Sequence, residues 1–480
     1  MVYRGKPSKS CRNCRRRDIK CDRKLNGCSQ CSRANISCPG YPNPSDLIIC
    51  DETSSTIDKR RRAEISLISP HSFTDSIPAR LLPSIEIHAK NLFISQYVAD
   101  TDKANLFTYM RVFWPPGTVK FPLLSTVVKA VWLAFFSFSH QSSPALHDAR
   151  VNYGSALMLT TTAIQSPTEA KENSTLMSLL LLSVYERLVY WEGNIIPSNA
   201  HLRGALGLVL YRGGSQFSDP IRMNMLLGLC EFIILDCLAH ETDIPQDLLI
   251  LKSRVMDDAD LSPKWRFLEL LLEYAQLKEM QRYGVSPAML ISEAVRLMSK
   301  LDDISHVLPP FACRKDMRRL EAASITHPDH NTRRSWNNIR IIRVLLADII
   351  REQCTKILGD LDITDPALIN QQLQECICII VSACSEICSS ASGNGIIGTA
   401  SQNVSSVQIS TLFFHLYAAY TFAILPLELK QLLHQRLRDL SEGQFPGIQR
   451  LMNQLLRETS AYEKNFWKVW LRLGKENFSI

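Results

Sequence analysis

The sequence has little that would set it apart from ordinary globular proteins. Charged residues make up 21% of its 480 residues and the hydrophobic set 46%, which excludes wholesale disorder and a collagen-like fibre. No apolar segment follows the polar, basic N-terminus as a secretory signal would, so we expect an intracellular protein in which disulfides are disfavoured. No nucleophile elbow, phosphate loop or metalloprotease helix signature occurs, and we expect no enzyme activity.

Long hydrophobic runs are also scarce. The two most apolar stretches, 123–138 and 411–425, fall short of the roughly 20 residues that a membrane-spanning helix needs. The first contains Lys129, and the second contains His415 and ends before Pro426. Both are predicted to be buried helices of a soluble bundle, and no membrane partner is expected.

Acidic residues are rare in the first forty positions, where the cysteines gather. Residues 1–40 hold eleven Lys and Arg against two Asp, a net charge of +9, whereas the other 440 residues carry 43 basic against 45 acidic side chains, a net −2. Six of the 15 cysteines lie between Cys11 and Cys38. Closely spaced thiols in a reducing compartment indicate metal ligands, and a basic surface favours a polyanion such as DNA. We therefore predict a basic, metal-binding module attached to a near-neutral body.

The six cysteines have the spacing C-x2-C-x6-C-x6-C-x2-C-x6-C, formed by Cys11, Cys14, Cys21, Cys28, Cys31 and Cys38. Each C-x2-C pair can supply two thiolates to one tetrahedral ion. Six ligands are too many for one zinc ion and too few for two separate four-thiolate sites, so two cysteines must be shared. The symmetry of the two halves selects Cys11 and Cys28 as the bridges. We predict two structural Zn²⁺ ions with no open coordination position.

The segment closely resembles the fungal binuclear zinc-cluster transcription factors, on the cysteine spacing together with Cys11-Arg12-Asn13-Cys14-Arg15-Arg16-Arg17-Asp18-Ile19-Lys20-Cys21-Asp22. The resemblance implies two zinc ions bridged by the first and fourth cysteines, and a short helix that enters the DNA major groove, commonly at CGG-type triplets. It also implies action in the nucleus on RNA polymerase II genes, with double-stranded DNA and transcription machinery or co-regulators as partners. A possible homodimer follows from the same family, although residues 47–85 show no sustained heptad.

The rest of the chain is predicted to be helical, because apolar residues recur at helical spacing from about residue 85 onward. Short segments of this part, 92–98, 174–177 with Tyr185 and Glu186, and 201–205, resemble the fungal-specific helical regulatory domain. The predicted fold class is mainly α: a two-zinc module with two short helices at 1–40, a flexible, partly disordered linker at 41–85, and a large all-α domain at 86–480. Helices are expected near 86–99, 122–139, 145–165, 172–191, 199–212, 220–240, 263–283, 287–300, 335–357, 366–389, 403–424 and 447–473.

The basic residues of the module divide by role, because helical spacing cannot place all of them on one face. Arg17, and Lys20 if it lies at the end of the helix, are the candidates for guanine O6 and N7. The residues expected to position the phosphate backbone are Arg15, Arg16, Arg23, Lys24 and Arg33.

Two residues depart from the family's usual pattern. Asp18 stands where many relatives have Lys or Arg. It could accept a hydrogen bond from cytosine N4, cap the helix, or pair with Arg15 or Lys20, and local pairing is favoured. Asn26 replaces a usual proline, and with Gly27 it is expected to form the turn by adopting positive φ.

Other signals have plainer interpretations. Residues 393–398 match G-x-G-x-x-G, but no acidic residue occurs from 387 to 427, so a loop is favoured over a dinucleotide site. Cys376, Cys378, Cys384 and Cys388 are interpreted as packing, and 327–330 as loop. The basic run 59–62 is equally consistent with a nuclear-import signal and a solvated linker. The alternative function is a helical protein that binds a partner or small molecule and whose zinc module mediates protein contacts.

Overall fold

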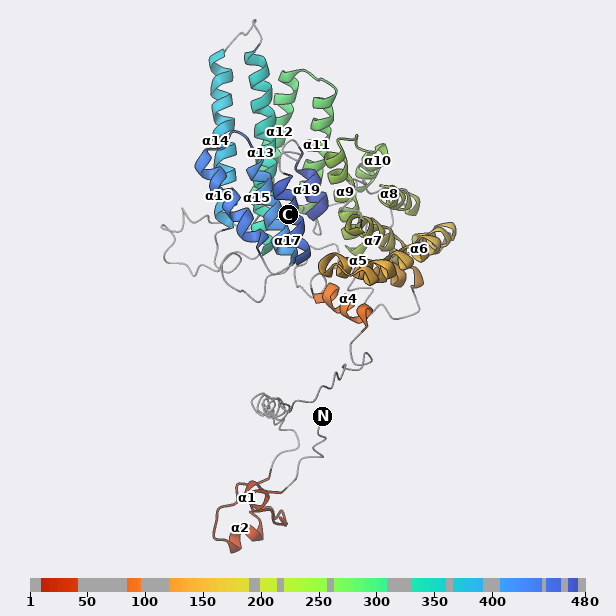
Figure 1. Cartoon of the computed structure of the whole chain (residues 1–480), viewed down its shortest axis with the longest axis vertical. Helices are drawn as coiled ribbons and strands as arrows, with labels where there is room; N and C mark the ends of the chain where they lie inside the picture. The colour runs from red at the N-terminus through yellow and green to blue at the C-terminus, as the bar shows by residue number, and fades with distance from the viewer. Residues whose placement is uncertain are drawn as a thin grey trace, which may run out of the picture. The chain divides into compact units, whose positions relative to one another are not determined.

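The computed structural model describes residues 10–41, 84–95, 121–189, 199–213, 220–256, 263–308, 330–359, 366–391, 406–442, 446–458 and 465–473. The chain divides into two compact units, Met1–Leu81 and Leu82–Ile480, coloured red and orange to blue in Figure 1. Most of the expected linker, the basic run 59–62, the glycine-containing segment 393–398 and residues 327–329 lie outside the described residues.

The first unit contains two short helices of five residues each, α1 (Arg12–Arg16) and α2 (Ser29–Arg33). In the described residues of the second unit the regular secondary structure is helical, which confirms the predicted mainly α class. Its elements are α4 (Ile85–Phe93), α5 (Pro122–His140), α6 (Ser143–Gln165), the 3-10 turn η4 (Glu169–Lys171), α7 (Asn173–Val189), α8 (Ala200–Arg212), α9 (Pro220–His240), α10 (Gln246–Met256), α11 (Pro263–Arg282), α12 (Pro287–Val307), α13 (His330–Leu358), α14 (Pro366–Ser390), α15 (Ser406–Tyr420), α16 (Leu427–Ser441), α17 (Pro446–Arg457) and α19 (Trp467–Leu473).

Two helices, α10 and α16, were not predicted. In α16 the buried residues Leu433, Leu437 and Leu440 do follow helical spacing, but polar and charged residues make up most of the rest of the segment and hide the pattern. The helix expected over 447–473 is wrong, because α17 ends at Arg457 and α19 begins at Trp467. At this restart the Asn465 side chain accepts a hydrogen bond from the Trp467 N–H, at 3.2 Å.

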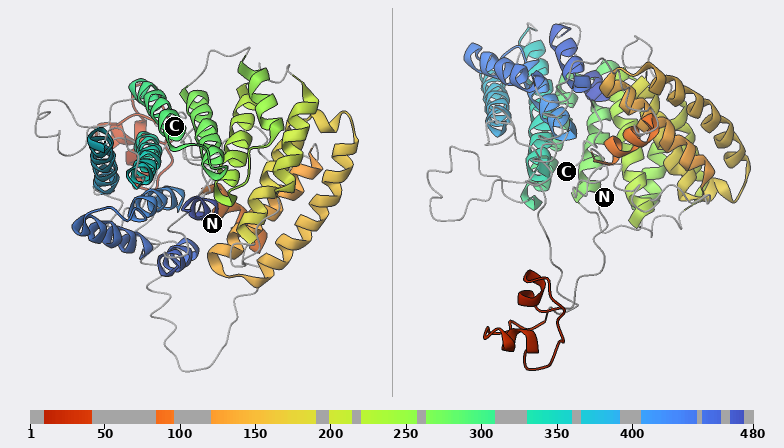
Figure 2. Two further views of the ribbon diagram at one scale, coloured as in Figure 1. Left: turned by 90° about the horizontal axis from the view of Figure 1, so that it is seen from above. Right: turned by 60° about the horizontal axis from the view of Figure 1, so that its bottom comes forward.

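Successive helices of the second unit pack side by side and form a closed ring, which can be traced in the left view of Figure 2. Contacts run through α5, α7, α8, α9, α11, α12, α13, α14, α15, α16 and α17, and α17 then packs against α5. At this closure Gly447 lies so close to α5 that an added Cβ would sit 2.8 Å from the Phe138 carbonyl oxygen. The Arg450 guanidinium donates to the same oxygen, at 2.7 Å. This hydrogen bond therefore joins α5, near the beginning of the unit, to α17, near its end.

Two helices, α5 and α14, are long and apolar enough to span a membrane by length and composition alone. The most apolar window of α5 is 67% buried inside the unit, which is how the core helix of a soluble protein looks. Lys129 of α5 pairs with Glu86 of α4 at 2.8 Å. The second stretch singled out from the sequence lies on α15 and the turn after it, where His415 is buried and bonds to Asn338. The two stretches predicted from the sequence to be buried, 123–138 and 411–425, are thus packed within the unit.

Two of the short motifs of the body, those containing Glu186 and His201, meet in a partly buried polar contact. Tyr153 of α6 donates its hydroxyl hydrogen to Glu186 of α7, at 2.7 Å, and lies 3.3 Å from His201 Nε2 of α8. Next to it, Asp236 of α9 accepts from the Asn199 side chain. These contacts join α6, α7, α8 and α9, and they give the motif residues a structural role.

Candidate metal centre

The six cysteines of the first unit converge on one cluster of sulfur atoms. The Sγ–Sγ distances are 3.6 Å for Cys11–Cys28, 3.7 Å for Cys11–Cys31 and 3.5 Å for Cys14–Cys28. Cys38 Sγ lies 3.9 Å from Cys28 Sγ. A zinc ion held at about 2.3 Å by tetrahedral thiolates has sulfur–sulfur edges of about 3.8 Å. The donor set and its spacing therefore fit zinc.

The sulfurs form two groups of four that share two members. One group is Cys11, Cys14, Cys21 and Cys28, and the other is Cys11, Cys28, Cys31 and Cys38. The shared pair, Cys11 and Cys28, is the pair that ligand counting and symmetry selected as bridges. The six cysteines thus form two zinc sites, and every ligand position is a thiolate, which leaves no site to activate water.

Burial makes a cation necessary for this arrangement. Five of the six cysteines are buried, and burial raises the pKa of the Cys14 thiol. Thiolates, not thiols, bind zinc, and packing several of them together is favourable only when a divalent ion compensates the charge. Apart from the sulfurs, the partly buried Tyr41 is the other apolar side chain packed in this cluster.

The two halves of the cluster repeat the same backbone at an offset of 17 residues. Cys11 and Cys28 are the N-caps of α1 and α2, and the Sγ of each accepts from the N–H three residues later, at 3.4 Å in both. The second residue after each helix has positive φ, Asp18 at 51° and Asn35 at 55°. In both halves the next N–H, of Ile19 or Ile36, bonds to the carbonyl five residues before it. These are paired Schellman endings.

The role of Asp18 is therefore to adopt the left-handed backbone conformation after α1, and not to form an ion pair. Asp and Asn are the non-glycine residues that most readily adopt the left-handed conformation, and both halves use one of them. The favoured pairing with Arg15 or Lys20 is wrong: in the part of the chain that the structure describes, Asp18 forms no ion pair. Its side chain is exposed beside Arg17.

Three hydrogen bonds that the sequence did not reveal hold the halves together. Asp22 accepts from the Ser29 N–H at the start of α2, at 3.0 Å, and the hydrogen bonds from Ser29 lower the pKa of Asp22. The Asn13 side chain donates to the Ser37 carbonyl, at 2.9 Å. The Tyr41 hydroxyl donates to the Lys24 carbonyl, at 2.7 Å. These side chains fix the loop between the third and fourth cysteines and the relation of α1 to α2.

The loop turn differs in detail from the prediction. Gly27 has φ 110° and its N–H bonds to the Lys24 carbonyl, so the turn forms as expected. The second residue with positive φ is Arg23, at 53°, and not Asn26. An added Cβ at Gly27 would lie 3.3 Å from Cys38 Cβ, a tight contact, so the glycine also allows close packing on the cluster.

The two halves differ in charge although they share a backbone. The candidate DNA contacts are all exposed, namely Arg15, Arg16, Arg17, Asp18, Lys20, Arg23 and Lys24. In the second half Arg16 corresponds to Arg33, but Arg12, Arg15, Arg17 and Lys20 correspond to Ser29, Ser32, Ala34 and Ser37. The basic field is therefore concentrated on α1 and the residues that follow it.

The remaining cysteines are packing residues for the most part. Of those that the structure describes in the second unit, Cys376, Cys384 and Cys388 are buried along α14, and Cys378 is exposed. Across the described residues, the groups of His, Cys, Asp and Glu able to hold one ion are the two of the cluster.

The geometry defines a two-site, six-thiolate zinc module with one basic helix, and sequence comparison gives the same class. Residues 9–47 match the fungal Zn(2)-Cys(6) binuclear cluster domain. The chain thus carries this domain at its N-terminus, followed by a large helical region. No curated protein and no solved structure matches the chain. The domain is that of DNA-binding transcription factors, which act in the nucleus and catalyse no reaction.

Proposed function

We propose that this chain is a sequence-specific regulator of RNA polymerase II genes, localised in the nucleus, whose α1 enters the major groove at CGG-type triplets. Residues 1–40 are the DNA-binding domain, 41–85 the linker and 86–480 a fungal-specific regulatory domain. A homodimer and co-regulators are part of the proposal. The observation that carries it is the difference in charge between two halves of identical backbone.

The proposal assigns separate roles to the basic residues. Arg17 is the C-cap residue of α1, and Lys20 lies beyond the helix rather than at its end. The proposal assigns guanine O6 and N7 to Arg17 first, with Lys20 as the second candidate. Arg15, Arg16, Arg23, Lys24 and Arg33 contact phosphates. Exposure of these side chains supports the assignment.

Selection of bound duplexes from a random pool by the zinc-loaded full chain tests the proposal. We expect enrichment of a CGG-type triplet and affinity that falls steeply with salt, because bound phosphates displace counterions. The Arg17→Ala change should relax the preference within the triplet at a cost of about 1–3 kcal/mol, whereas Arg23→Ala should weaken all sequences alike. Binding that is independent of both sequence and salt would favour a protein-contact role for the module.

A further inference from the structure

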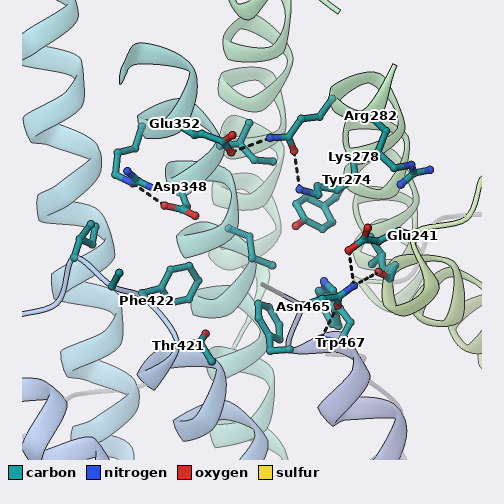
Figure 3. A pocket seen from close by; sticks show the side chains of 18 residues that line it. Glu241, Tyr274, Lys278, Arg282, Asp348, Glu352, Thr421, Phe422, Asn465 and Trp467 are labelled. Carbon is teal, nitrogen blue, oxygen red and sulfur yellow. Dashed lines mark hydrogen bonds and ion pairs between the residues drawn. The ribbon is translucent and has the colours of Figure 1, made fainter. Parts of the chain in front are cut away.

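The second unit contains a cavity that the DNA-binding function does not use. It has a volume of about 440 Å³, within the range of small-molecule sites, and lies among α9, α11, α13, the turn after α15 and the start of α19 (Figure 3). Its wall joins segments far apart in the chain: Asn465 donates to the Leu238 and Ala239 carbonyls, at 3.1 Å each. A ligand here would contact several helices at once.

One part of the wall is aromatic. Tyr274, Phe422, Phe466 and Trp467 line the cavity, and all four are largely buried. Figure 3 shows Phe422 and Trp467 at the lower side of the cavity and Tyr274 beside Lys278. This part suits an apolar group of a ligand.

The other part is charged, with three acidic and three basic side chains. Four of these already have ionic partners. Arg351 Nε bonds to Asp348 at 2.7 Å, Glu352 pairs with Lys356 at 3.0 Å, and Arg282 pairs with Asp243 at 2.8 Å. Lys278 and Glu241 are the two remaining charged side chains of the wall.

Lys278 and Glu241 are held only by neutral amides. Lys278 Nζ donates to Gln281 Oε1, at 2.6 Å, and Glu241 Oε1 accepts from Asn465 Nδ2, at 3.1 Å. Neither forms an ion pair with any residue that the structure describes. An ammonium has three donors and a carboxylate about four acceptor sites, so both keep unused hydrogen-bonding capacity. Burial lowers the pKa of Lys278, and the charges of Glu352, Glu241 and Asp348 offset this only in part, so an anion in the cavity would add to their effect.

We propose that this cavity binds a small zwitterion of the α-amino-acid type with an apolar side group. Its carboxylate accepts from Lys278, its ammonium donates to Glu241, and its side group packs against Tyr274, Phe422 and Trp467. A molecule with one charge would pair with only one of the two groups, whereas a zwitterion pairs with both the partly buried Lys278 and the solvent-exposed Glu241. The proposal does not depend on the DNA-binding function.

Calorimetric titration of the zinc-loaded full chain tests it, with L-phenylalanine and L-leucine as probes. The matched analogues are 3-phenylpropionate, which lacks the ammonium, and 2-phenylethylamine, which lacks the carboxylate. We expect at least one of the two amino acids to bind. Each analogue should bind at least about tenfold more weakly than L-phenylalanine. No heat with either amino acid up to about 10 mM, or equal binding of the analogues, would overturn the proposal.

Variants then locate the site. Lys278→Met should weaken amino-acid binding at least tenfold, and so should Glu241→Gln. Lys300→Met is the control, because Lys300 pairs with Glu273 and does not line the cavity. Thermal melts without probe establish that each variant is folded. If Lys278→Met and Lys300→Met bind the amino acid equally well, the site is elsewhere and the proposal is wrong.

Discussion

The two units are stabilised by different interactions. In the first, the buried side chains are cysteines, while Ile19, Leu25 and Ile36 are 36%, 101% and 40% exposed. In the second, a continuous apolar core runs from α4 to α19. A module of about 40 residues buries too little apolar surface to fold by itself, so its fold depends on a bound ion. The helical unit has no such dependence, and the comparison can be tested unit by unit.

Metal removal should have the largest effect and should separate the two units completely. We expect two zinc ions per chain, and a chelator that extracts them should unfold the first unit and abolish DNA binding. The thermal transition of the helical unit should stay unchanged, because its core contains no metal ligand group among the described residues. Zinc content, DNA binding and calorimetric melting report the three results separately.

Cysteine variants sharpen the same test. Cys28→Ser removes a ligand of both sites, so it should lose both ions, whereas Cys378→Ser in the second unit should lose neither. A chelated protein that kept its DNA affinity would contradict the dependence of the first unit on zinc.

The next effect concerns the helical unit alone. Gly447→Ala should destabilise it by about 2–3 kcal/mol, because the new Cβ would lie 2.8 Å from the Phe138 carbonyl oxygen and 2.9 Å from Ser139 Cα, both backbone atoms. Helix propensity alone predicts the opposite sign. Gly204→Ala in α8 is the control, since nothing lies within 4 Å of its Cβ position and alanine should stabilise or leave stability unchanged. Denaturant melts give both values, and zinc content should not change. Equal effects of the two changes would mean that α17 does not close against α5 as described.

A buried carboxyl should make the helical unit sensitive to pH. Burial raises the pKa of Glu231 in α9 to about 8, and the charges of Arg334 and Lys264 offset this only in part. Because the folded-state pKa lies above the unfolded value, the contribution to stability is present below about pH 4.5 and is lost as pH rises towards 8. We expect a loss on the order of 2 kcal/mol between about pH 5 and pH 8.

Glu231→Gln should remove the contribution of this carboxyl to the pH dependence and make the unit more stable than wild type at pH 8. Glu375→Gln on the exposed side of α14 should retain it. Melts of the three proteins across this pH range give stability as a function of pH. If Glu231→Gln shows the same pH dependence as wild type, the titrating group is not Glu231.

The zinc sites could be predicted because cysteine spacing and ligand counting leave few solutions. Six thiolates for two tetrahedral ions require two bridges, and the pair Cys11 and Cys28 follows from the repeat. The helical class followed from apolar periodicity for the same reason: the period is a local property of the sequence. Both features are determined by residues close together in the chain.

The parts that sequence missed depend on distant contacts. The break between α17 and α19 coincides with bonds from Asn465 to carbonyls 226 and 227 residues away, which no local pattern encodes. The cavity likewise needs α9, α11, α13 and α19 together. Asp18 is an intermediate case: its side chain suggested an ion pair, yet the offset of 17 residues already aligned it with Asn35, a residue type that also adopts positive φ.

The smallest expected effect isolates that position. Asp18→Asn should change the stability of the first unit by less than about 1 kcal/mol, because Asn35 shows that asparagine fits the same backbone position in the other half. Removing a negative charge beside Arg17 should raise DNA affinity about threefold at low salt, equally for all sequences, and the gain should shrink as salt screens it. Asn35→Asp is the matched reverse change; on the nearly neutral half it should weaken binding less than Asp18→Asn strengthens it. If Asp18→Asn instead weakens binding to one triplet and not to others, then the carboxylate accepts a hydrogen bond from cytosine N4, and the residue reads sequence as well as ending the helix.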